Sequence, residues 1–177
     1  MTYAENVVAC FESATPDEYR AGMTWYNDAH QFALSLDNDV WRAAGVIAAM
    51  SVQKQWDVNV RLAERAYATG KVTGNFHTMN AQGQRILDGE HPMEVLGGDK
   101  VRAFCAAIAT DGMSDIAVID RHAHDIAMGR VFTDATRKIG KRLYRTMAMH
   151  YGEAAKEVGV SVNQIQAVTW VRWRNIK

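Results

Sequence analysis

Apolar residues recur at helical spacing along most of the chain, and this pattern predicts its elements. The clearest case runs from Pro16 to about Leu36, where Thr15 is suited to cap a helix and Pro16 to occupy its first position. Glu18 completes a capping box with Thr15. The apolar stripe consists of Met23, Tyr26, Ala29, Phe32 and Ala33. This spacing predicts a helix with one buried face.

The next segment is apolar nearly all round. Val40-Trp41 and the run from Ala43 to Met50 follow Asn38 and Asp39, either of which can cap a helix. A helix without a polar face has to be covered on several sides. The segment therefore predicts a central, buried helix.

Seven more helical segments follow, with a weaker pattern of apolar and polar positions. They are Trp56–Ala68, Met79–Leu87, Pro92–Leu96, Lys100–Thr110, the segment from Asp120 to Met128, Thr133–Tyr151 and Val162–Asn175. Alternation of apolar and polar residues with a period of two is nowhere sustained. The fold class is therefore predicted to be all-α, a single domain over residues 1–177 with about nine or ten short helices.

Composition places the chain among ordinary globular proteins. Of its 177 residues, 48% are hydrophobic and 23% are charged. No apolar run approaches the length of a membrane span, and the segment Met1–Cys10 lacks the basic start of a secretory signal. Cys10 and Cys105 alone cannot make a disulfide scaffold or a four-thiolate cluster. We expect a reduced, cytoplasmic protein (in the host cell cytoplasm if phage-encoded), without a cofactor, bound metal or membrane partner.

The formal net charge of zero hides an uneven distribution. Residues 1–129 carry a net charge of −7, whereas residues 130–177 carry +7. Such a split predicts a face that binds a polyanion. The alternative is that the solvated faces of long helices produce the same uneven charge distribution by chance.

One stretch carries a recognisable order of features. The sequence LGGDKVR at residues 96–102 is followed by a helical segment and then by VIDRH at residues 118–122. This order resembles the helix–hairpin–helix (HhH-GPD) DNA glycosylase superfamily. There, backbone N–H groups of a glycine hairpin approach a DNA phosphate, a role that the resemblance implies for Gly97 and Gly98. The family's active-site Asp follows an apolar run and often precedes a His by two residues, which implies that Asp120 stabilises positive charge on the sugar.

The resemblance extends to a lysine. Lyase-competent members of the superfamily carry Lys at the start of the second hairpin helix, and Lys100 precedes Asp120 by 20 residues. The GDKV sequence is similar to the 8-oxoguanine-excising branch, so Lys100 is implied as a nucleophile, with Arg102 as a neighbouring cation and DNA contact. A solvated lysine and a plain helix cap are the alternatives for Lys100 and Asp120.

A second match lies upstream of the hairpin. The sequence AAMSVQ at residues 48–53 resembles the family segment in which Ser-x-Gln follows a buried helix. In relatives this Gln enters the duplex beside the extruded base, which implies DNA contact for Gln53. A solvated residue at a helix end is the alternative.

Several features depart from the family pattern. The hairpin lacks the usual Pro and the second spaced Gly, and Asp99 would repel a phosphate unless it turns away or caps the helix. The iron–sulfur loop of some members is absent, and the chain is shorter than typical relatives. With these departures, the chain resembles compact, phage-type versions of the fold more closely than housekeeping repair enzymes.

Basic and aromatic residues near the C-terminal end add candidates. Arg137, Lys138, Lys141, Arg142 and Arg145 recur as one helical stripe. We expect Arg137, Lys141 and Arg145 to contact DNA phosphates with salt-dependent affinity, with a solvated face as the alternative. Trp170 and Trp173 either anchor the last helix or stack on bases. His122 and His124 diverge by about 200° on a helix, which disfavours a metal site.

These features predict an enzyme that binds double-stranded DNA, flips a modified or damaged base and cleaves its N-glycosidic bond, with lyase activity at the resulting abasic site. The alternative is a non-catalytic DNA- or protein-binding module of phage type that acts on a host target. The imperfect hairpin favours that module, whereas the Lys100–Asp120 spacing favours the enzyme.

Overall fold

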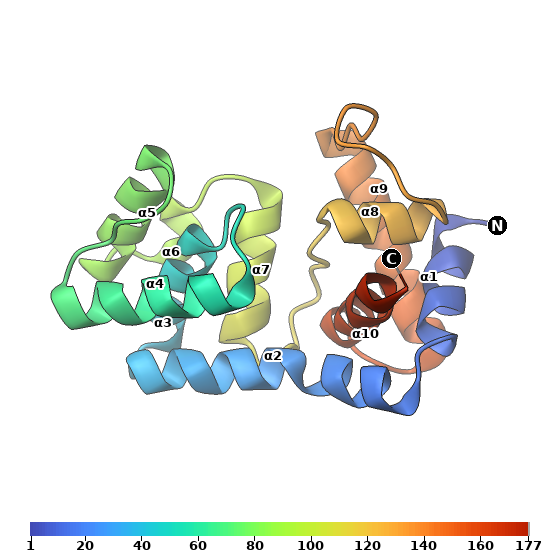
Figure 1. The fold of residues 1–177 in the computed structure, drawn as a ribbon, viewed down its shortest axis with the longest axis horizontal. Coiled ribbons are helices and arrows are strands. Elements are labelled where there is room, and N and C mark those ends of the chain that lie inside the picture. Colours follow the sequence, from blue (N-terminus) through green and yellow to red (C-terminus); the bar gives the residue numbers. More distant parts are fainter. Residues whose placement is uncertain (177) are drawn as a thin grey trace. The chain divides into compact units, whose positions relative to one another are not determined.

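The chain is all-α, as the sequence predicts, in a computed structural model that describes residues 1–176 (Figure 1). The described residues form ten helices, in agreement with the nine or ten expected. They are α1 Tyr3–Glu12, α2 Pro16–Leu36, α3 Val40–Met50, α4 Trp56–Thr69, α5 His77–Leu87, α6 Pro92–Val95, α7 Asp99–Ala109, α8 Arg121–Met128, α9 Lys141–Val158 and α10 Val162–Asn175. Among these helices, none is long and apolar enough to cross a membrane.

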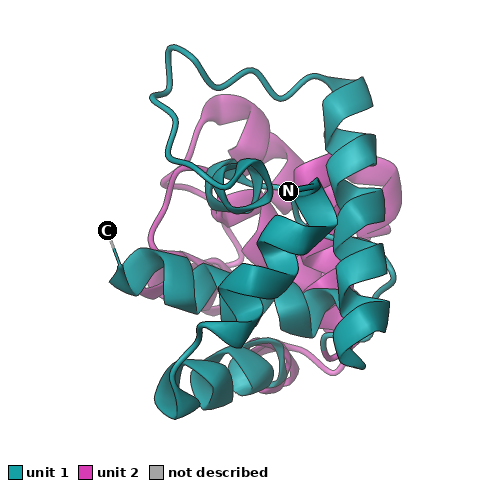
Figure 2. Cartoon of the chain, turned by 90° about the vertical axis from the view of Figure 1, so that its right-hand side faces the viewer, with its two compact units in different colours: residues 1–27, 112–177 teal, residues 28–111 magenta. Residues whose placement is uncertain are grey.

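The chain divides into two compact units (Figure 2). Unit 1 comprises residues 1–27 and the chain from Gly112 onward, and unit 2 comprises Asp28–Asp111. The expectation of a single domain over residues 1–177 stays a prediction.

Unit 2 is built around α3, as its apolar sequence predicts. Every residue from Ala43 to Met50 is buried, and α4, α5, α6 and α7 all pack against this helix. The start of α3 is capped by Asp39, whose carboxylate accepts a hydrogen bond from the backbone N–H of Arg42 at 3.2 Å. The central helix therefore fixes the positions of the four helices around it.

Unit 1 packs α1, α8, α9 and α10 around a second core. The core includes Val7, Ile126, Met147, Tyr151 and Ile165, all of them nearly or fully buried. Helix α1 has no counterpart among the predicted elements. Its signal was nevertheless present, because Thr2 and Glu5 form a complete capping box.

Gly22 marks the place where α2 approaches α10 within unit 1. A Cβ atom at this position would lie 2.4 Å from the Cα atom and 2.6 Å from the backbone nitrogen of Val168. Because a backbone cannot move aside as a side chain can, we expect Gly22→Ala to lower the free energy of unfolding by about 2 kcal/mol. Urea unfolding followed by circular dichroism measures this change.

Gly152, in the middle of α9, is the matched control. A Cβ atom there would meet nothing within 4 Å. Alanine has the higher helix propensity, so Gly152→Ala is expected to raise the free energy of unfolding by about 0.5–1 kcal/mol. Equal effects of the two substitutions would contradict the close approach at Gly22.

Candidate functional site

The glycine hairpin lies in unit 2 between α6 and α7. Helix α6 ends at Val95, and Leu96 closes it by donating its N–H to the carbonyl of Pro92 at 2.8 Å. Gly98 has a positive φ of 82° and occupies the position before α7, and both Gly97 and Gly98 are exposed. The predicted order of short helix, glycine turn and helix is therefore confirmed, and the turn presents open backbone.

Lys100 and Arg102, both in the first turn of α7, have different surroundings. Lys100 is exposed to solvent. Arg102 donates from Nε to the carbonyl of Leu96 at 2.8 Å and from Nη2 to the carbonyl of Met93 at 2.7 Å. Its guanidinium thus satisfies carbonyl groups at the end of α6 and holds the hairpin closed. Asp99 is exposed at the first position of α7, where a carboxylate is favourable to the helix dipole.

Gln53 lies in unit 2 in a turn with an unusual backbone conformation. Its φ is 57°, a value that residues other than glycine rarely adopt, and its side chain is exposed. Asn75 supports the turn, because its Nδ2 donates to the carbonyls of Met50 at 3.0 Å and Val52 at 3.3 Å. The strained turn that contains Gln53 is thus tied to the segment directly before α5.

Phe76 is a neighbouring feature that was not among the predicted site residues. It precedes α5 directly and is 54% exposed, and its N–H donates to Asn75 Oδ1 at 2.8 Å. Asn75 therefore links an exposed aromatic ring to the turn that carries Gln53. An apolar residue at the N-cap position of α5, where a polar cap is usual, was the available signal.

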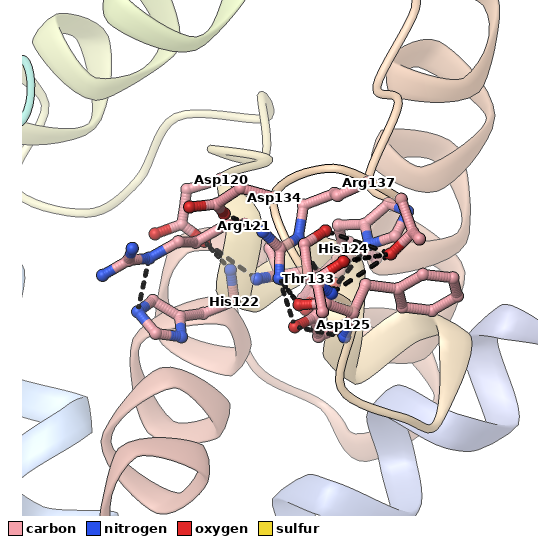
Figure 3. Close-up of polar contacts among 12 residues, drawn as sticks. Asp120, Arg121, His122, His124, Asp125, Thr133, Asp134 and Arg137 are labelled. Atoms are coloured by element: carbon pink, nitrogen blue, oxygen red, sulfur yellow. Dashed lines mark hydrogen bonds and ion pairs between the residues drawn. The ribbon is translucent and has the colours of Figure 1, made fainter.

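Asp120 lies in unit 1 at the start of α8. Its Oδ1 accepts hydrogen bonds from the N–H groups of His122 at 2.9 Å and Ala123 at 2.8 Å (Figure 3). The predicted capping position is confirmed. The carboxylate is half-buried and fixed in direction, because one oxygen is held by the helix backbone.

Buried tyrosines support the segment around Asp120. Tyr144 donates to the carbonyl of Ala117 at 3.1 Å, and Tyr151 donates to the carbonyl of Ala123 at 3.2 Å. Burial first, and then the negative charge of Asp120, raise the pKa of Tyr26. The hydroxyl groups of Tyr144 and Tyr151 therefore tie the residues on both sides of Asp120 to the core of unit 1.

The two histidines of α8 point to different neighbours. The His122 ring meets Trp170 edge-on with centroids 6.3 Å apart, whereas the His124 ring meets Phe132 at 4.9 Å. This divergence follows from helical geometry, as the sequence predicts. Within residues 1–176, no three His, Cys, Asp or Glu side chains come together as metal ligands would.

A buried charge cluster follows Asp120 on α8. The side chain of Asp125 is fully buried, and Arg137 holds it with two bonds, from Nε to Oδ1 at 3.0 Å and from Nη2 to Oδ2 at 2.8 Å. His124 Nδ1 lies 3.0 Å from Asp125 Oδ1, and the N–H of Phe132 donates to Oδ2 at 3.2 Å (Figure 3). Asp134 completes the cluster from the surface, 2.6 Å from Nη1 of Arg137.

The expected helix over Thr133–Tyr151 is wrong at its start. Residues 133–140 form a turn and a loop, and α9 begins at Lys141 after Gly140. Arg137 therefore does not belong to a continuous helical stripe, and its guanidinium is 8% exposed and faces Asp125. A role for Arg137 in binding phosphate would compete with this buried ion pair.

Lys141 and Arg145 remain on one exposed face of α9, and Arg142 is exposed beside them. No acidic residue lies in the first turn of this helix. Cations at the start of a helix are disfavoured by its dipole. The three cations at the start of α9 therefore destabilise the helix, and they would attract an anionic partner.

Asp125 predicts an acid sensitivity. Burial raises the pKa of its carboxyl, but the bonds from Arg137, His124 and the N–H of Phe132 outweigh burial and lower the pKa from 3.8 to about 2. Because the pKa is depressed in the folded state, this stabilisation is present above about pH 4 and is lost as the pH falls toward 2. The stability difference between wild type and Asp125→Asn should therefore shrink by about 2 kcal/mol from about pH 5 to pH 2. Urea unfolding at each pH measures it, and a difference that stays constant would contradict the assigned charge state.

The site residues are thus divided between the two units. Unit 2 contains Gln53, Gly97, Gly98, Lys100 and Arg102, and unit 1 contains the remaining four. Those four are Asp120, Arg137, Lys141 and Arg145.

Comparison with known protein families gives a match over the whole chain. Residues 1–177 match a profile described as a family of unknown function (DUF7178). The chain belongs to this family. No curated protein and no solved structure matches it.

Proposed function

We propose that the protein binds double-stranded DNA in the cytoplasm, flips a modified or damaged base out of the duplex and cleaves its N-glycosidic bond. The observation that carries this proposal is the geometry of Asp120. Its carboxylate is half-buried, anchored by two backbone N–H groups and followed by His122, which faces an aromatic ring. A carboxylate fixed in this way can stabilise the positive charge that develops on the sugar as the base leaves.

The glycine hairpin supports the DNA-binding part of the proposal. Gly97 and Gly98 are exposed before an eleven-residue helix, and the N–H groups at such a helix start can receive a phosphate. Arg102 closes the hairpin from the side of α6, so it would contribute to DNA binding through the shape of the turn. Gln53 and the exposed Phe76 are suited to enter a duplex, since both project from one supported turn region.

The basic residues of unit 1 supply an electrostatic contribution. Lys138, Lys141, Arg142 and Arg145 are all exposed. Contacts of this kind to phosphates give affinity that falls as salt rises. We expect Lys141 and Arg145 to carry this dependence, together with the hairpin.

Lys100 is the candidate for lyase chemistry. Its amine would bond to the sugar C1′ as the bond to the base breaks and the base departs with a proton. Opening of the sugar ring then gives a Schiff base, which borohydride reduces to a stable amine. The resemblance to the helix–hairpin–helix DNA glycosylase superfamily, in a compact form, motivates this step.

Borohydride trapping on duplexes with abasic or damaged sites tests the enzymatic proposal. A covalent adduct that forms with wild type and is lost in Lys100→Ala is expected. Lys71→Ala is the matched control, because it removes another exposed lysine of unit 2 and should leave trapping intact. No adduct and no base release across a panel of lesions would overturn the enzymatic function.

A second candidate is a non-catalytic DNA- or protein-binding module that acts on a host target. The exposure of Lys100 favours it, because a nucleophilic lysine needs burial or a close cation, and the Arg102 guanidinium is directed to the carbonyl groups of Leu96 and Met93. Affinity for duplex DNA that falls steeply with salt, and that weakens in a Lys141→Gln/Arg145→Gln variant, would support DNA binding in the absence of catalysis. A flat salt response would favour a protein partner.

A further inference from the structure

Trp170 on α10 occupies an unusual position in unit 1, because it is half-buried between aromatic and charged side chains. Its ring lies 6.3 Å from the ring of Trp25 and 6.3 Å from the ring of His122. These contacts hold the indole in place from within the unit. His122 also connects it to the N-terminal turn of α8, which Asp120 caps.

The outer side of Trp170 opens onto a surface hollow. Trp170, Val171, Arg174 and Asn175 line this hollow, which has a volume of about 270 Å³. The Arg174 guanidinium lies 4.5 Å from the centroid of the Trp170 ring. Arg174 is exposed, and none of the acidic side chains within residues 1–176 forms an ion pair with it. The hollow thus combines a flat aromatic surface with an exposed cation.

The neighbouring residues of α10 have structural roles that Trp170 and Arg174 lack. Arg172 lies 3.5 Å from the carboxylate of Glu18 and donates to Ser13 Oγ at 3.1 Å. Trp173 packs against the core of unit 1. The last helix therefore anchors itself through Arg172 and Trp173, and this arrangement leaves Trp170 and Arg174 beside the hollow.

We propose that Trp170 and Arg174 form a binding site for single-stranded DNA, in which an unpaired base stacks on the indole and Arg174 pairs with the adjacent phosphate. The ring of a base offers a flat face of the same kind as the guanidinium that now covers Trp170. Arg174 can exchange its contact with the indole for a charge-assisted bond to phosphate without losing an ion pair. Arg121 adds a second exposed cation. Its Nε donates to His122 Nε2 at 3.4 Å, and the His122 ring contacts Trp170.

This inference takes the choice of DNA from the proposed function, but it assigns a different surface and a different strand form. Duplex contacts involve the hairpin, the turn with Gln53 and the start of α9. The site at Trp170 requires unpaired bases, because the faces of paired bases are covered by their stacked neighbours. The two proposals can therefore fail separately.

Fluorescence anisotropy with two labelled strands of equal length tests the site. One strand is a thymine oligonucleotide of about eight nucleotides, and the other has the same sugar–phosphate backbone without bases. We expect wild type to bind the thymine strand about tenfold more tightly than the abasic strand. Trp170→Leu should abolish this difference, whereas Trp170→Phe should retain most of it because phenylalanine also stacks.

Arg174→Gln separates the phosphate contact from stacking. It should weaken binding of both strands by several-fold, and Lys156→Gln, which removes an exposed cation on α9, should weaken binding by less. Since Arg174 is exposed, this variant keeps the test valid even if Trp170→Leu fails to fold. Equal wild-type affinity for the two strands, or unchanged binding in both Trp170→Leu and Arg174→Gln, would overturn the site.

The matched measurement on Asp120→Asn distinguishes the two proposals. If that variant loses base release but binds the thymine strand as wild type does, the single-strand site stands independently of the catalytic role. If Trp170→Leu and Arg174→Gln leave strand binding unchanged while wild type still releases a base from duplex DNA, only the single-strand site fails.

Discussion

Replacing Arg137 with alanine is expected to lower the free energy of unfolding of the protein by about 3–5 kcal/mol. The side chain of Asp125 is fully buried and receives two hydrogen bonds from this guanidinium. Without Arg137, the protein must either bury an unpaired carboxylate or protonate it, and both are costly. The loop before α9 should lose its anchor at the same time. Urea unfolding and hydrogen exchange of the backbone N–H of Phe132 measure the two effects.

Asp134→Ala is the control for this substitution. Asp134 pairs with the same guanidinium, but its side chain is 88% exposed. An exposed ion pair contributes little, so this variant should remain close to wild type in stability. If Arg137→Ala and Asp134→Ala had similar small effects, the buried pair would not be the anchor of the loop.

The Arg137 position explains why the sequence pattern misplaced the start of α9. Five cations recur at helical spacing from Arg137 to Arg145, and local periodicity cannot distinguish an exposed stripe from one that is partly turned inward. The partner of Arg137 is Asp125, which lies twelve residues earlier, on α8. Gly140 was the available local signal, since it precedes the true first residue of α9.

Elements with strong local signals were predictable. The buried helix α3 follows from its apolar composition, and α10 has the predicted bounds because Ser161 and Gln164 form a capping box at its start. The cap at Asp120 follows from its place between an apolar run and a helix. These features depend on residues within a few positions of one another.

Candidate site features that arise from tertiary contacts were not predictable. Phe76 is connected to the turn of Gln53 through Asn75, and Trp170 meets His122 from a different helix. The sequence left open whether Trp170 and Trp173 anchor α10 or stack on bases. In the structure Trp173 packs against the core, whereas Trp170 lines a hollow. Residues three apart on one helix still differ in environment, because the surrounding helices cover only part of its surface.

Asp120→Asn is expected to reduce base release by about 10²–10³-fold if the proposed function is correct. Asparagine caps a helix about as well as aspartate, so the bonds to the N–H groups of His122 and Ala123 can be retained. The substitution therefore removes the negative charge beside the sugar and leaves α8 in place. Single-turnover release of a base from a duplex substrate measures the effect.

Asp120→Ala separates the cap from the charge. It should lower the free energy of unfolding by about 1 kcal/mol, since it loses the bonds to the N–H groups of α8, whereas Asp120→Asn should not. Loss of base release in the alanine variant alone, together with its lower stability, would identify Asp120 as a structural cap. Comparable loss in both variants, with normal stability of Asp120→Asn, would identify the carboxylate charge as the required property.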